Sequence, residues 1–160
     1  MKRSRYFMPL ILVAAVVVDQ FTKHLVATNM QLFQSIQIIP GFFSLTYIHN
    51  TGAAWSILEG KTIFFIIIGI VAIVILAAFY RHLGKHEYAD RIGIILMIAG
   101  TIGNLIDRFL HVYVIDFLDF YIFNYNFPVF NIADTCLVIG VFIILISELR
   151  ESLGVKHYGR

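Results

Sequence analysis

Apolar residues gather into four long runs along this chain, separated by more polar stretches. A bilayer core of about 30 Å is crossed by a helix of roughly 20 mostly apolar residues. The second run has no charged residue, and from Asn131 to Ser147 the fourth has one acid, Asp134, near its start. The pattern therefore predicts four transmembrane helices, over about residues 6–25, 62–80, 92–108 and 131–149.

The first run could instead be the apolar part of a cleaved secretory signal, because Lys2, Arg3 and Arg5 precede it. No clear small-x-small cleavage pattern follows, and Asp19 and Lys23 stand where such a pattern would lie. We therefore expect the first run to remain as a helix, and residues 1–160 to form one integral membrane domain.

The placement of lysine and arginine predicts how the chain is oriented. Nine of these residues precede the first run, lie between the second and third runs, or follow the fourth. The other three fall on the opposite side. Since basic residues favour the cytoplasm, both termini are expected there. The two long loops, about residues 26–61 and 109–130, then face outward.

The first long loop has an unusual composition. No charged residue occurs from His24 to Leu58, whereas Phe42, Phe43, Tyr47 and Trp55 supply aromatic rings. Aromatic rings are enriched at membrane interfaces. Apolar and polar residues alternate around Tyr47, as they do in a strand. We therefore expect an all-α polytopic membrane protein with a small extracytoplasmic β-sheet and an interfacial helix in the first outer loop.

The overall composition agrees with a membrane protein. Hydrophobic residues make up 59% of the chain and charged residues 14%, whereas soluble domains carry about 25% charged residues. A soluble enzyme, a disordered tail and a nucleic-acid binder are all disfavoured. One cysteine excludes an internal disulfide and a cysteine zinc site.

Ionisable and amide side chains cluster toward one end of the predicted helices. Such groups are costly at membrane depth, so they are candidates for function. Within each helix they are three or four residues apart, which places them on one face. An alternative interpretation is a set of ordinary helix-end ion pairs at the interface. The residues are Asp19, Lys23, Asn104, Asp107, Arg108, Asn131 and Asp134, with Asp116 and Asp119 in the second outer loop.

Asp134 stands out because no basic residue lies within a helical turn of it. A second carboxyl group that shares a proton with it would compensate its burial. Such a pair can activate water and protonate a leaving group, which suggests hydrolysis of an amide or ester. Spacing leaves the partner open. The candidates are Asp116, Asp119, Asp107 and Asp19.

Five motifs occur in an order and spacing that resemble the lipoprotein signal peptidase (signal peptidase II) family, over about residues 6 to 150. The motifs are Asp19–Lys23, Asn50–Trp55, Gly103–Arg108, Val114–Phe117 and Phe130–Asp134.

The resemblance implies a bacterial plasma-membrane aspartyl endopeptidase with no metal and no cofactor. It implies cleavage of prolipoproteins before a diacylglyceryl-modified cysteine, inhibition by globomycin-type antibiotics, contact with membrane lipids and no nucleic-acid partner; we also expect a monomer. By this resemblance the catalytic pair is Asp116 and Asp134. The resemblance assigns substrate binding or support of the site to Asp19, Lys23, Asn50, Gly52, Asn104, Asp107, Arg108 and Asn131.

Two other classes of function remain as alternatives. Buried acids also form proton relays, which would suit a small proton-coupled transporter or channel subunit. A relay would place acids at several depths, however, and the second and third runs carry none through their middles. Polar residues can also hold together a non-catalytic assembly subunit.

Overall fold

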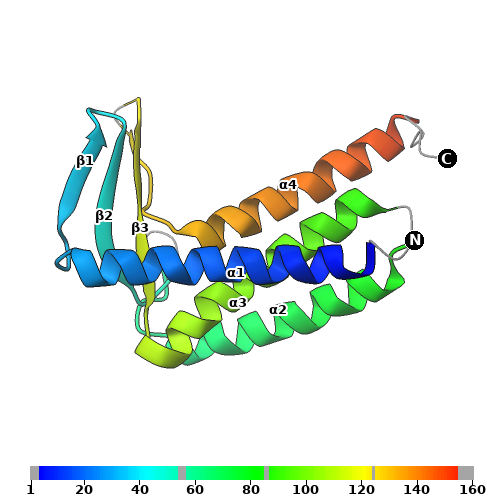
Figure 1. Ribbon diagram of the computed structural model, residues 1–160, viewed down its shortest axis with the longest axis horizontal. Coiled ribbons are helices and arrows are strands. Elements are labelled where there is room, and N and C mark those ends of the chain that lie inside the picture. Colours follow the sequence, from blue (N-terminus) through cyan, green and yellow to red (C-terminus); the bar gives the residue numbers. More distant parts are fainter. Residues whose placement is uncertain (1–3, 54–56, 85–86, 124, 155–160) are drawn as a thin grey trace.

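Four long helices run side by side, and a small sheet stands across one end of them (Figure 1). The computed structural model describes residues 4–53, 57–84, 87–123 and 125–154. The helices are α1 (Ser4–Asn29), α2 (Thr62–His82), α3 (Tyr88–His111) and α4 (Ile132–Ser152). The strands are β1 (Ser35–Ile39), β2 (Phe43–Asn50), β3 (Val114–Ile122) and β4 (Tyr125–Asn126).

The four helices predicted from the apolar runs are present, and each is long and apolar enough to cross a membrane. α1, α2 and α3 extend beyond the predicted limits, because hydropathy marks the part that contacts lipid rather than the hydrogen-bonded helix. α4 starts one residue later than predicted. Asn131 caps it: its side chain accepts a hydrogen bond from Asp134 N–H, and the Asp134 carboxylate accepts one from Asn131 N–H.

The sheet is antiparallel, in the order β1-β2-β3-β4, and both long loops contribute to it. The sequence indicated a sheet in the first loop alone. The pairing of β2 with β3 was missed because it joins segments far apart in the chain. This pairing sets Ile48 opposite Asp116 and Asn50 opposite Val114, so one end of β2 lies beside a candidate catalytic residue.

The helix expected in the first outer loop is absent from the described part of that loop, residues 30–53 and 57–61. The end of the Asn50–Trp55 motif, residues 54–56, lies outside the described residues. Ala53 N–H donates to the Ile57 carbonyl at 2.9 Å. Leu58 and Gly60 have positive φ angles of 57° and 76°, which a helix does not accept.

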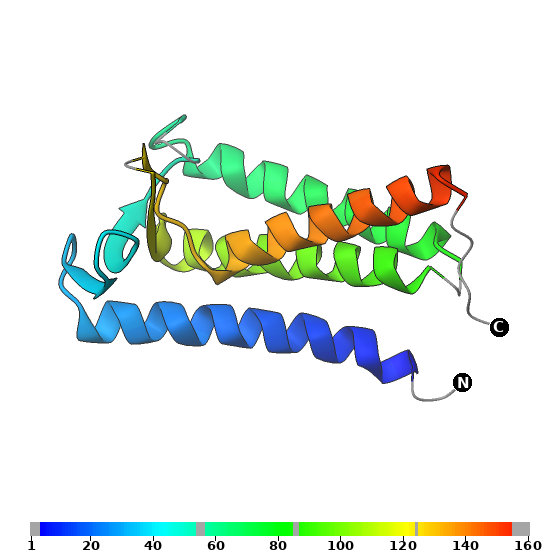
Figure 2. The same ribbon diagram turned by 90° about the horizontal axis from the view of Figure 1, so that it is seen from above.

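α3 is the central helix and packs against the other three. In Figure 2, α1 lies on one side of α3 and α2 on the other. Close approach to α4 depends on glycine. A Cβ atom on Gly93 would lie 2.8 Å from the Gly140 carbonyl oxygen, and one on Gly100 would collide with the Ala133 carbonyl oxygen. Small residues let membrane helices approach in this way.

Gly100→Ala is therefore expected to lower stability. The added methyl group meets the α4 backbone, which cannot rotate away, and overpacking of this kind costs about 1–3 kcal/mol. Gly69→Ala is the matched control, because the three atoms nearest to its added Cβ all belong to the Leu105 side chain, the first at 2.9 Å. Thermal unfolding in detergent compares the two variants. Equal melting temperatures would contradict the packing argument.

Candidate active site

The polar residues singled out above lie where α1, α3 and α4 meet the sheet. Several of them are almost completely shielded from solvent, which is costly for charged groups unless they are paired. The residues among them with 2% exposure or less are Asp19, Lys23, Asp107, Asp116 and Asn131.

Lys23 is the centre of a buried ionic cluster. Its ammonium group lies 2.9 Å from Asp19 Oδ2 on the preceding turn of α1 and 2.9 Å from Asp107 Oδ2 on α3. It also donates to Asn104 Oδ1 at 3.0 Å. One cation thus faces two carboxylates and an amide oxygen, and α1 is tied to α3.

The same two carboxylates also accept hydrogen bonds from the backbone. Asp19 Oδ1 accepts from Ala133 N–H at 2.8 Å, which satisfies a free amide in the first turn of α4. Asp107 Oδ2 accepts from Ile115 N–H at 3.1 Å, at the start of β3. The cluster therefore holds the residues directly before Asp116 and Asp134.

Asn131 links Asp116 to Asp134. Its Nδ2 donates to Asp116 Oδ1 at 2.7 Å. Its Oδ1 accepts from Asp134 N–H at 2.9 Å, and its own N–H donates to Asp134 Oδ2 at 3.2 Å. Both acids line one cavity of about 600 Å³. The two acids come from different elements of the chain, and both are hydrogen-bonded to Asn131.

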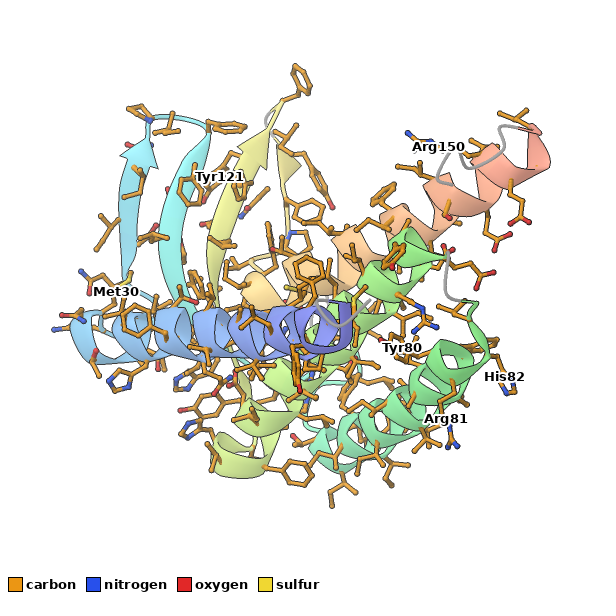
Figure 3. All side chains as sticks on the ribbon, turned by 45° about the vertical axis from the view of Figure 1, so that its right-hand side comes forward. Met30, Tyr80, Arg81, His82, Tyr121 and Arg150 are labelled. Atoms are coloured by element: carbon orange, nitrogen blue, oxygen red, sulfur yellow. The ribbon has the colours of Figure 1, made fainter. Side chains whose placement is uncertain are left out.

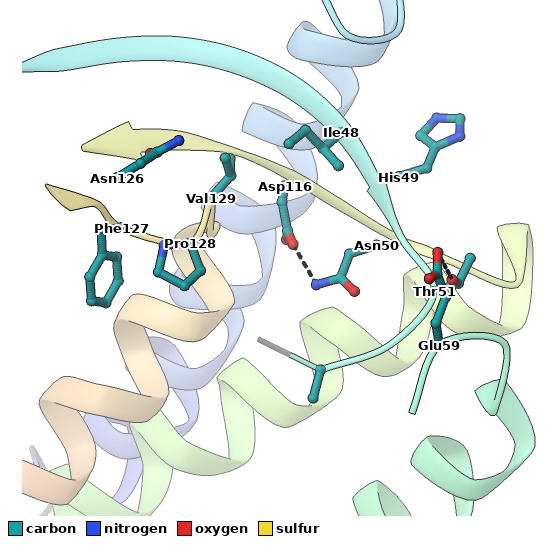
Figure 4. Close-up of a pocket in the computed structure, with 11 residues that line it drawn as sticks. Ile48, His49, Asn50, Thr51, Glu59, Asp116, Asn126, Phe127, Pro128 and Val129 are labelled. Carbon is teal, nitrogen blue, oxygen red and sulfur yellow. Dashed lines mark hydrogen bonds between the residues drawn. The ribbon is translucent and has the colours of Figure 1, made fainter. Parts of the chain in front are cut away.

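Two further amides hold the free sides of this pair. Asn50 Nδ2 donates to Asp116 Oδ2 at 2.8 Å (Figure 4). Asn104 Nδ2 donates to Asp134 Oδ1 at 2.7 Å. Because Asn104 Oδ1 faces the Lys23 ammonium, its NH₂ group must face Asp134. Both acids are therefore oriented by neutral amide groups, and neither forms an ion pair with a basic side chain among the described residues.

The environment of Asp116 favours its protonated form. Burial, and then the neighbouring Asp134, raise the pKa of Asp116 from 3.8 to about 7. Hydrogen bonds from Asn50 and Asn131 act in the opposite direction but are outweighed. Two carboxyl groups in one buried site cannot both ionise freely. The arrangement can therefore hold one proton between two acids near neutral pH.

Arg108 lies on the wall of the same cavity. Its guanidinium group donates to the Gly52 carbonyl at 3.2 Å and lies over the Phe65 ring, 4.9 Å from the ring centre. Gly52 N–H in turn donates to Asn50 Oδ1 at 2.9 Å. These contacts place a positive charge near the pair and connect Gly52 with Asn50.

The acids that remained open as partners of Asp134 have different surroundings. Asp19 and Asp107 face Lys23. Asp119 is buried but accepts from Thr46 Oγ1 at 2.6 Å, within the sheet. Asp116 alone among the four lines the cavity that holds Asp134.

Sequence reasoning missed Gln20. Its Nε2 donates to Asp107 Oδ1 at 2.9 Å and to the Gly103 carbonyl at 3.1 Å, so it joins the buried cluster. Its place between Asp19 and Lys23, three residues before the lysine, was the available signal.

Fold and site together define a multi-pass membrane protein with two aspartates in one cavity at the end of its helix bundle. Residues 11–150 match the family described as signal peptidase (SPase) II. The chain therefore belongs to the signal peptidase II family and is an aspartic-type peptidase. A transporter or channel subunit finds no support in this membership.

Relatives and solved structures agree. The chain is 41% identical to a lipoprotein signal peptidase of Staphylococcus haemolyticus (strain JCSC1435), over 94% of this chain and 97% of that protein. It is 44% identical to one of Staphylococcus aureus (strain bovine RF122 / ET3-1), over 92% and 91% of the two chains. A bacterial membrane enzyme solved by the in meso method at 2.3 Å superposes with a TM-score of 0.88. That structure is 42% identical and matches 96% of this chain and 94% of its own.

Proposed function

We propose that this protein is a membrane aspartyl endopeptidase that removes the signal peptide from diacylglyceryl-modified prolipoproteins, with cleavage before the lipidated cysteine. The observation that carries the proposal is the joint placement of Asp116 and Asp134 in one cavity, linked by Asn131. The relatives named lipoprotein signal peptidase support the substrate class.

In the proposed mechanism the two aspartates share one proton. The ionised carboxylate removes a proton from a water molecule, and the oxygen of that water attacks the scissile carbonyl carbon. The protonated acid then donates its proton to the leaving amine as the C–N bond breaks. Asn50, Asn104 and Asn131 hold the carboxyl groups in place throughout. No further co-reactant than water is required.

The cavity suits a lipidated peptide. Its walls include apolar side chains from α2 and α4, namely Phe65, Leu137, Val138 and Ile139. Arg108 lies on the same wall and can donate to peptide or ester carbonyl oxygens. Globomycin-type inhibitors would occupy this space, the surrounding partners would be membrane lipids, and we propose that the enzyme acts as a monomer.

We also propose that the protein spans the bacterial cell membrane with both termini in the cytoplasm. Arg81, His82 and Arg150 lie at the end of the bundle away from the sheet (Figure 3). Basic residues favour the cytoplasmic side. The sheet and the two aspartates would then lie near the outer face, where water can reach the scissile bond.

A cleavage assay tests this function. Purified protein in detergent micelles is mixed with a diacylglyceryl-modified precursor, with and without EDTA, and the product is resolved by gel shift. We expect cleavage just before the lipidated cysteine, unchanged by EDTA. Failure of a well-folded protein to cleave would overturn the proposal, and inhibition by EDTA would overturn its metal-free chemistry.

Cleavage is expected to decline as the pH rises through about 7, because the pair then loses its shared proton from Asp116. The contribution of this proton to the free energy of unfolding also falls as the pH rises. The folded chain keeps a proton that the unfolded chain releases above pH 3.8, so this stabilisation is complete below 3.8 and is lost as the pH rises to about 7.

The variant Asn50→Ala sharpens this test. The Asn50 hydrogen bond lowers the pKa of Asp116, so its removal should move the midpoint of the decline to higher pH. Profiles of kcat/KM against pH for the two proteins provide the measurement. A midpoint that stays fixed or moves to lower pH would contradict the assignment of the proton to Asp116.

A further inference from the structure

A second cavity lies beside the one that holds the aspartate pair. It has a volume of about 310 Å³ and is formed by the end of β2, Glu59 and residues 126–129 (Figure 4). Asp116 and Asn50 belong to the walls of both cavities, as do Pro128 and Val129. The proposed catalytic acid thus stands at the boundary between two spaces.

The two cavities differ in chemical character. Apolar side chains of α2 and α4 line the larger one. The smaller one carries polar groups from His49, Asn50, Thr51, Glu59 and Asn126 beside Asp116. A chain cleaved at the boundary must continue into both spaces. In a prolipoprotein the apolar signal segment precedes the scissile bond, and the more polar mature sequence follows it.

Glu59 is the charged group that distinguishes the smaller cavity. Its side chain is exposed, and Thr51 Oγ1 lies 3.5 Å from Glu59 Oε1 (Figure 4). The described part of the cavity wall contains no lysine or arginine. The ion pairs found among the described residues both belong to Lys23, so Glu59 takes part in neither.

Building on the proposed function, we propose that the smaller cavity binds the residues that follow the lipidated cysteine, and that Glu59 selects for lysine or arginine there. A space of this volume is roughly 7 Å across, which is the length of two extended residues. The selection therefore concerns the two positions directly after the cysteine. The carboxylate of Glu59 would form an ion pair with a basic side chain at either position.

Three precursors test the proposal. They are lipidated on the same cysteine and differ only in the next two residues, which are both serine, both lysine or both glutamate. The wild-type protein should cleave the lysine precursor about two- to fivefold faster than the serine precursor in kcat/KM, as for an exposed ion pair. The glutamate precursor should be the slowest. The preference should weaken at high salt, because exposed charges are screened.

Substitutions at Glu59 complete the test. In Glu59→Gln the lysine-to-serine ratio should fall to about one, and in Glu59→Lys the order of the lysine and glutamate precursors should reverse. Glu151→Gln is the matched control, because it removes an exposed carboxylate near the opposite end of α4 and should keep the wild-type ratio. A wild-type ratio near one, or a ratio that persists in Glu59→Gln, would overturn the proposal.

The serine precursor separates this proposal from the broader one. If the wild-type protein cleaves it and charge has no effect, the peptidase function stands and the role of Glu59 is wrong. If the folded protein cleaves none of the three precursors, the peptidase function fails, and the assignment of the smaller cavity fails with it.

Discussion

Replacement of Asp116 or Asp134 by asparagine is expected to abolish cleavage and to leave the protein folded. An amide has nearly the shape of a carboxyl group, so it can occupy the same place beside Asn131. It cannot take a proton from water or give one to the leaving amine. Acid–base catalysis contributes about 10²- to 10⁴-fold, so each variant should lose at least about 100-fold in kcat.

Asp119→Asn is the matched control for this prediction. Asp119 is a buried acid in the same strand, but its carboxylate contacts Thr46 rather than the cavity. Its replacement should leave kcat within a few-fold of wild type. Single-turnover cleavage and thermal unfolding in the same detergent measure activity and folding separately. Activity close to wild type in Asp116→Asn or Asp134→Asn would refute the catalytic pair.

Lys23→Met is expected to produce the largest loss of stability. The side chain is 2% exposed, and its ammonium group lies 2.9 Å from each of two buried carboxylates. Methionine fills a similar volume but leaves Asp19 and Asp107 without a countercharge. Removal of one partner from a buried ion pair costs about 3–5 kcal/mol. Because Lys23 also orients Asn104, the variant should lose cleavage as well.

A control and a rescue make this prediction specific. Lys61→Met removes an exposed lysine and should change the free energy of unfolding by no more than about 0.5 kcal/mol. Adding Asp107→Asn to Lys23→Met should restore part of the lost stability, because one uncompensated charge disappears. Chemical unfolding in micelles measures the free energy of unfolding of these three variants and of the wild-type protein. A Lys23→Met variant as stable as Lys61→Met would show that the buried cluster does not stabilise the fold.

Parts of the fold were predictable because they depend on short stretches of chain. The α2 span could be read directly, since Thr62 to Tyr80 contains no charged residue. The sheet was only half predictable, because β3 comes from the other long loop and its pairing with β2 is a long-range contact. The interfacial helix that we expected is absent from the described part of its loop. The reason is local, because the positive φ angles of Leu58 and Gly60 are incompatible with a helix.

By itself, the sequence determined that the chain spans a membrane four times and that its polar residues gather at one end of the helices. These features follow from hydropathy and helical periodicity, which act over a few turns. Its motifs indicated the family. Spacing along the chain left the partner of Asp134 open, because it does not fix distances between elements, and the resemblance implied Asp116. Only the tertiary structure shows that Asp116 shares a cavity with Asp134. Pairing of β2 with β3 and the close packing of α4 on α3 place Asp116 there.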